Sequence, residues 1–334
     1  MAEARDPPDA SASLALARPS AADPAAHWFA ALRELGEVVD LRALYFETAT
    51  SEPRRWVLPH ESYDGTRMLQ FILHEVRGAT AILPAPKQTR PPSFFARIAA
   101  FLRQALARPR PLVRPRTLVP GARGDIDAPL GYELIDRDEV SAIAKRADEL
   151  GASLNAHLLW ALDRAVYGQL AEPNPWHAWT LSVNMRGAVG ELDELPNVVV
   201  AIAIDLAEKG SPRDARDAMR AALRGNAHWG AWYALRLLNA FGERRIRRFA
   251  AKFNARPRPV SMGTFSSVGP LEVEDAGWIC CVPPVMRTHP VAAGAVNTGG
   301  RLALAIQTHP ILGPVDATVL ATRWRDYARG TLVE

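Results

Sequence analysis

Cysteine and long apolar runs are scarce in this sequence, and one stretch has no acidic residue. The only two cysteines, Cys280 and Cys281, are adjacent. Adjacent cysteines rarely bond to each other, which excludes a disulfide framework and favours the reducing cytoplasm. No apolar run reaches the roughly 20 residues of a membrane span. Residues 1–24 are rich in Ala, Pro, Ser and Asp and lack the order of a secretory signal, so they predict a flexible leader.

Acidic residues are absent between Glu75 and Asp125, whereas ten Arg and Lys residues occur there, although the net charge of the chain is only +4. A second basic cluster consists of Arg244, Arg245, Arg247, Arg248 and Lys252. Such segments suit an anionic lipid, coenzyme A, an acidic carrier protein or nucleic acid, and a solvated surface is the alternative. No nucleic-acid-binding fold is recognisable, so we expect no specific nucleic-acid partner.

Several kinds of site are missing. The sequence has no GxxxxGK phosphate loop, no GxGxxG after a strand and no G-x-S-x-G elbow. Its histidines lack metal-ligand spacing, so we predict no metal and no permanently bound cofactor. With 334 residues, 48% of them apolar, the chain can bury one large core or two subdomains.

The hydrophobic pattern predicts alternating helices and strands. A helix is expected from residue 27 to Gly36, strands at 38–48 and 56–58, and a helix over 66–77. Residues 93–107 predict an amphipathic basic helix, which together with the extended linker up to residue 116 is a candidate contact with the inner face of the membrane.

The part of the chain after residue 132 has dense α/β patterning. Helices are expected at 138–150, after a cap at Ser153, over much of 212–253, and from a cap at Asp316 to 329. The run 198–206 is apolar enough to predict a strand that is buried on both faces.

The stretch 54–78 carries the pattern most typical of chemistry. His60 follows a strand, Asp64 comes four residues later, and Gly65 opens a helix. A turn of this kind can hold an imidazole in one orientation for general-base work. The alternative is a turn histidine that bonds only to the backbone.

The H-x-x-x-D-G motif is followed in order by the helix SLNAHLLWALDRAV, by LSVNMRG, by a strand after Pro196-Asn197, by FSSVGPL and by RLALAIQTHPILGPVD. This order, over about residues 54–330, resembles the chloramphenicol-acetyltransferase-like acyltransferase superfamily, most of all its wax ester synthase/diacylglycerol acyltransferase and condensation-domain branches. The resemblance implies an α/β fold of two sandwich lobes with the active site in a tunnel between them. We expect the lobes at 25–124 and 125–334, the first shortened because only 59 residues precede His60.

The resemblance also implies roles for single residues. His60 would be the general base, and Asp64 would be structural, turned toward an arginine. Gly65 would permit the backbone path of the turn and close packing of the helix. A further group matches family positions at the oxyanion site or the tunnel: Ser266, Ser267, Asn184 and Arg186.

The implied reaction moves an acyl group from a thioester, acyl-coenzyme A or an acyl carrier protein, to a hydroxyl or amine acceptor, as in lipid metabolism. The coenzyme A or phosphopantetheine arm would arrive with the substrate. Pro59 stands where the family usually has a first histidine. With the short first lobe, it keeps open an alternative: a catalytically degenerate member that binds a partner through its basic face.

Overall fold

The computed structural model describes residues 26–78, 91–106, 113–189, 197–240, 242–273 and 277–332. The predicted leader, residues 1–24, lies outside the described residues. The elements follow in this order: α1 (Ala26–Glu34), β1 (Asp40–Phe46), β2 (Arg54–Pro59), α2 (Gly65–Arg77), α3 (Phe94–Leu106), β3 (Leu130–Ile135), α4 (Arg137–Glu149), α5 (Leu154–Leu170), β4 (Trp176–Asn184), β5 (Val199–Ala207), α6 (Pro212–Arg224), α7 (Ala227–Ala240), α8 (Glu243–Asn254), β6 (Gly263–Leu271), β7 (Trp278–Val282), β8 (Val291–Thr298), β9 (Arg301–Thr308), a 3-10 turn (Pro310–Leu312) and α9 (Ala317–Arg329).

Two sheets form the centre of the described fold. The small sheet has the order β2-β1-β7 and is antiparallel, with Asp40 opposite Pro59 and Phe46 opposite Trp278. The large sheet has the order β3-β9-β8-β6-β4-β5, in which β6 runs parallel to both β8 and β4. Because β7 comes late in the chain, the small sheet joins the N-terminal hairpin to the C-terminal half.

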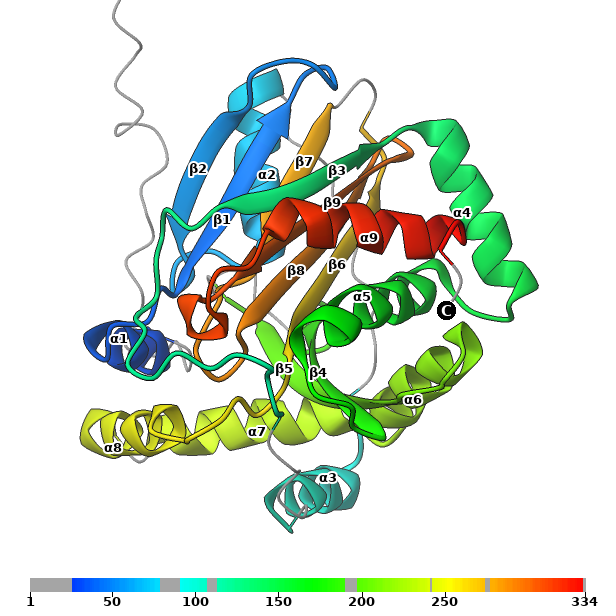
Figure 1. Ribbon diagram of the computed structural model, residues 1–334. Coiled ribbons are helices and arrows are strands. Elements are labelled where there is room, and N and C mark those ends of the chain that lie inside the picture. Colours follow the sequence, from blue (N-terminus) through cyan, green and yellow to red (C-terminus); the bar gives the residue numbers. More distant parts are fainter. Residues whose placement is uncertain are drawn as a thin grey trace, which may run out of the picture.

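The sheets pack face to face, and helices cover their outer faces (Figure 1). Leu44 and Phe46 of β1 point toward Ala303 and Ala305 of β9, as the two-residue period of a strand requires. Gly294 of β8 marks a close approach of the sheets, because a Cβ there would lie 1.6 Å from a carbonyl oxygen of β7.

Helix α2 covers the outer face of the small sheet. Met68, Leu69, Ile72 and Leu73 are fully buried against β1 and β7, and they recur at the spacing that places residues on one side of a helix. Gly78 ends α2 with a left-handed backbone, at φ +63°. The helix predicted from this spacing is confirmed.

Other predicted helix features are confirmed as well. Ser153 caps α5 by accepting a hydrogen bond from the Ala156 N–H, and Asp316 caps α9 in the same way. The segment expected as an amphipathic helix at 93–107 forms α3. Neither α3 nor any other helix within the described ranges is long and apolar enough to cross a bilayer.

Strand β5 corrects one expectation. Residues 198–206 were expected to be buried on both faces, but β5 is the edge of the large sheet, with Ile202 and Ile204 buried and Ala201 and Ala203 exposed. Alanine at the exposed positions makes the run look uniformly apolar, so hydropathy alone conceals the alternation of an ordinary one-sided strand.

Candidate active site

The turn between β2 and α2 presents His60. The N–H groups of Ser62 and Tyr63 both donate to the Pro59 carbonyl, which folds the chain back directly after the strand. Asp64 then caps α2 by accepting a hydrogen bond from the Arg67 N–H at 2.9 Å. A strand end, a tight turn and a capped helix start therefore fix the backbone on both sides of the imidazole.

The contacts of His60 define its tautomer. Nδ1 lies 2.8 Å from the Tyr63 carbonyl oxygen and 3.3 Å from the Asn197 amide nitrogen. A carbonyl only accepts, so the shorter contact requires the proton on Nδ1. The Asn197 side-chain amide donates to the His60 carbonyl at 2.9 Å, and its oxygen accepts from the Val199 N–H. Nε2, which no described residue hydrogen-bonds, then carries the lone pair.

The surroundings of His60 favour the neutral ring. Burial lowers the pKa of His60 below its ordinary value of 6.5, although the Tyr63 carbonyl and the carboxylates of Asp64 and Glu61 oppose the shift. The Phe29 ring of α1 lies 4.6 Å from the imidazole, centre to centre. A neutral imidazole with its Nε2 lone pair available is the form that can take up a proton.

Asp64 lies fully buried at the point where three segments meet. Its Oδ2 lies 2.5 Å from Nη2 of Arg186, and it also accepts from the Val198 N–H at 3.4 Å. These contacts join α2 to the end of β4 and the start of β5. Asp64 faces this junction, as a residue that braces the turn would.

Asn184 and Arg186 come to the same turn from the end of β4. The Asn184 amide donates to the Thr66 hydroxyl at 3.1 Å, and its oxygen accepts from the Arg186 N–H at 2.8 Å. Both residues therefore contact the beginning of α2. No role was predicted for Asn197. The sequence feature that could have pointed to it is its position immediately before the apolar residues that form β5.

The two serines on β6 point in opposite directions. Ser267 donates to the Asn155 side chain of α5 at 3.0 Å. Ser266 is on the other face of the strand, together with Val268. A Cβ at Gly65 would lie 3.9 Å from a Val268 methyl, so this face of β6 is the one that meets the start of α2.

Gly65 differs from its expected role. It is the first residue of α2 and is not among the residues with positive φ. A side-chain carbon there would make only ordinary van der Waals contact with Val268. Neither the backbone path nor close packing requires glycine at this position.

The carboxylate of Glu61, the residue after His60, forms an ion pair with an arginine of α1. It accepts two hydrogen bonds from Arg33 of α1, at 2.7 and 2.9 Å, and Arg33 also binds Asp40. This ion pair fastens α1 to the turn. Both carboxylate oxygens of Glu61 are therefore engaged by Arg33.

No family model matches this sequence, and no curated protein matches it. Solved structures do match its fold. Polyketide synthase associated protein 5 from Mycobacterium tuberculosis has a TM-score of 0.50 at 15% identity, over 82% of this chain and 73% of that chain. The epimerization domain from the third module of tyrocidine synthetase B has 0.49 at 14%, over 82% and 67%. The first condensation domain of the CDA synthetase has 0.47 at 13%, over 82% and 62%.

At such identities the likeness shows the fold alone. The chain shares the α/β fold of polyketide synthase associated protein 5, and the α/β fold class expected from the sequence is confirmed. It spans between 62% and 73% of the length of these three structures.

Proposed function

We propose that this protein is an acyltransferase that moves an acyl group from a thioester to a hydroxyl or amine acceptor, with His60 as general base. The observation that carries the proposal is the state of the imidazole: Nδ1–H is held by the Tyr63 carbonyl, and Nε2 keeps its lone pair. The Asp64–Arg186 pair holds the turn that presents the ring.

The reaction can be written with this one base. Nε2 takes the proton of the acceptor O–H or N–H as that atom attacks the thioester carbonyl carbon. The tetrahedral intermediate collapses, the C–S bond breaks, and the proton passes from Nε2 to the leaving thiolate. His60 returns to its neutral state, so no metal or permanently bound cofactor is required.

The oxyanion of that intermediate needs a donor, and we assign this role to Ser266 in preference to Ser267. The Ser267 hydroxyl already donates to Asn155, whereas Ser266 shares the strand face of Val268, which meets α2. Removal of one such donor typically lowers kcat about a hundredfold or more. We therefore expect Ser266→Ala to lower kcat by about two orders of magnitude and Ser267→Ala to change it little, measured as product formed per minute.

The donor class follows from charge. Helix α8 packs on α1, the helix that supplies Phe29 next to His60. Its exposed face carries Arg244, Arg248 and Lys252. Basic side chains this close to the turn suit the phosphates of coenzyme A or an acidic carrier protein, and both donors bring the acyl thioester.

The same basic helix favours a second candidate, a member of the fold that has lost catalysis and binds an acidic partner. Two further observations support it: the small sheet has only β1, β2 and β7 among the described residues, and Pro59 precedes His60. In this case α8 would serve binding alone.

Thioester turnover separates the two candidates. The full chain is incubated with acyl-coenzyme A donors of several lengths and with alcohol or amine acceptors, and both free thiol and acylated product are measured. We expect both to depend on His60, with His60→Ala inactive and still folded by circular dichroism. His74→Ala, which changes an exposed histidine of α2, is the matched control.

Thiol release that persists in the His60→Ala variant would refute the assigned base. If coenzyme A donors and acylated carrier proteins both give no release, while an acidic carrier protein binds and Arg244→Glu abolishes that binding, the second candidate is correct.

A further inference from the structure

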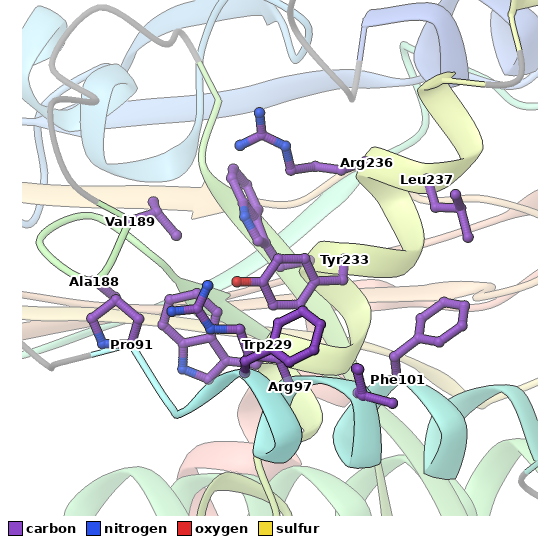
Figure 2. A pocket seen from close by; sticks show the side chains of 12 residues that line it. Pro91, Arg97, Phe101, Ala188, Val189, Trp229, Tyr233, Arg236 and Leu237 are labelled. Carbon is purple, nitrogen blue, oxygen red and sulfur yellow. The ribbon is translucent and has the colours of Figure 1, made fainter.

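A pocket of about 740 Å³ lies between α3, α7 and the turn after β4. Figure 2 shows the side chains that line it, from both helices and from the turn. We call it the α3–α7 pocket. It is lined by apolar and aromatic side chains and by two arginines, Arg97 and Arg236. His60 is not among them.

The walls of the pocket are almost entirely apolar and aromatic. From α7, Trp229 and Trp232 are buried, and the rings of Trp229 and Tyr233 stack with centres 5.9 Å apart. From α3, Phe94 and Ile98 line the opposite wall and remain 66% and 42% exposed. Exposed apolar walls around an open volume are typical of a ligand site, since a core contact would have closed the space.

The charges of the pocket have one sign. Arg97 and Arg236 are its two charged lining residues, and no lining residue is acidic. The Arg97 guanidinium lies 5.9 Å from the centre of the Tyr233 ring, and its Nε donates to the Pro92 carbonyl at 2.7 Å. That bond uses one of its five N–H donors.

Arg236 is held in a similar way at another wall. Its guanidinium lies 5.7 Å from the centre of the Trp232 ring. Figure 2 shows Arg97 and Arg236 on either side of Tyr233, whose hydroxyl end is directed toward Ala188 and Val189. Arginines stacked on aromatic rings are preorganised to bind carboxylate or phosphate.

From this combination we infer that the α3–α7 pocket binds a single-chain lipid anion, such as a long-chain fatty acid. The aromatic walls hold the alkyl chain, and Arg97 and Arg236 hold the carboxylate or phosphate head. The volume lies within the range of about 300–1,000 Å³ typical of small-molecule pockets. Nothing in this inference depends on acyl transfer by His60.

Direct binding tests the inference. The full chain is titrated with cis-parinaric acid, a fluorescent long-chain fatty acid, below its micellar concentration, and quenching of tryptophan fluorescence is followed in parallel because Trp229 and Trp232 lie in the wall. We expect saturable binding at one site. Non-fluorescent fatty acid should displace the probe, and the fatty alcohol of the same chain length should displace it about tenfold less well.

Two variants separate the head group from the chain. Arg236→Gln, at an exposed position, should weaken fatty-acid binding about tenfold and leave the alcohol unchanged. Leu237→Asn, which makes an apolar lining position polar without adding charge, should weaken binding of the acid and of the alcohol alike. Arg220→Gln, an exposed arginine of α6 outside the pocket, should change neither.

Absence of saturable binding would overturn the inference, and so would equal affinity for acid and alcohol. Sedimentation with phosphatidylglycerol vesicles, without binding of the monomeric probe, would assign the face to a membrane instead. Unchanged probe binding by His60→Ala is expected, so failure of the proposed acyl transfer and failure of this site give different results.

Discussion

The pair of Asp64 and Arg186 gives the most direct test of how the candidate turn is held. We propose the substitution Asp64→Asn, which keeps a side-chain oxygen to cap α2 and replaces the charged Oδ2 by a neutral NH2 group that cannot accept from Arg186 or from the Val198 N–H. Asp64 is 0% exposed, and its Oδ2 lies 2.5 Å from Arg186. The variant removes the carboxylate that Arg186 contacts, at a site where the arginine side chain is only 12% exposed.

Breaking a buried ion pair by removing one member costs about 3–5 kcal/mol. For a chain of 334 residues, the entropy of unfolding is about 0.7 kcal/mol/K, from about 2.1 cal/mol/K per residue. The expected fall in Tm is therefore about 4–7 °C. Asp217→Asn is the matched control, because Asp217 pairs with Arg216 at 2.9 Å on the surface and is 52% exposed; we expect less than about 1 kcal/mol there.

The assay is thermal unfolding by calorimetry, with urea unfolding as a second measure of the free energy. The double variant Asp64→Asn with Arg186→Met removes both charges, so it should recover a large part of the loss. If Asp64→Asn lowers Tm no more than Asp217→Asn, or if the double variant shows no coupling, the account of Asp64 as the brace of the turn is wrong.

Three other outcomes are expected. Gly65→Ala should fold and keep its stability within about 1 kcal/mol. Gly294→Ala, whose Cβ would lie 1.6 Å from a carbonyl oxygen of β7, should lower Tm far more than Gly65→Ala does. Equal Tm values of the two variants would contradict the close packing described at Gly294. The rate kcat/KM should stay high as pH falls to 6.5 and decline only below it, since burial lowers the pKa of His60 and keeps the base neutral; a decline centred above pH 6.5 would count against His60. Burial lowers the pKa of His309 from 6.5 to about 4, so its stabilising contribution is complete above pH 6.5 and is lost toward pH 4, by about 3 kcal/mol. Glu37, whose pKa is raised by burial, offsets part of this loss. The free energy of unfolding of His309→Asn, measured with urea between pH 7 and pH 4, should depend less on pH than that of the original chain. An equal pH dependence would refute the contribution assigned to His309.

Local features could be predicted from the sequence because local physics decides them. The apolar spacing of residues 68–73 forms one side of a helix regardless of what it packs on. Ser153 and Asp316 cap helices because their side chains reach N–H groups two or three residues on. The turn from His60 to Asp64 was recognisable for the same reason.

Which faces of the helices and strands pack together could not be predicted, since contacts between distant segments depend on the packing of the whole chain. The alternation of β5 between Ile202 and Ala203 appears only when the strand has a place at the edge of a sheet. Gly65 was expected to permit the backbone path of the turn and close packing of the helix, yet the space around it is open enough for a methyl group.

The sequence by itself determined the helices, their caps, the composition of the candidate turn and the resemblance that suggested its chemistry. Tertiary structure alone decided that Arg186, 122 residues away, neutralises Asp64, and that Asn197 holds the His60 carbonyl. It also decided that Ser266, and not Ser267, shares the face that meets α2. A buried charge is stabilised by whichever partner the folded chain places next to it, and the spacing of residues along the sequence does not reveal that partner.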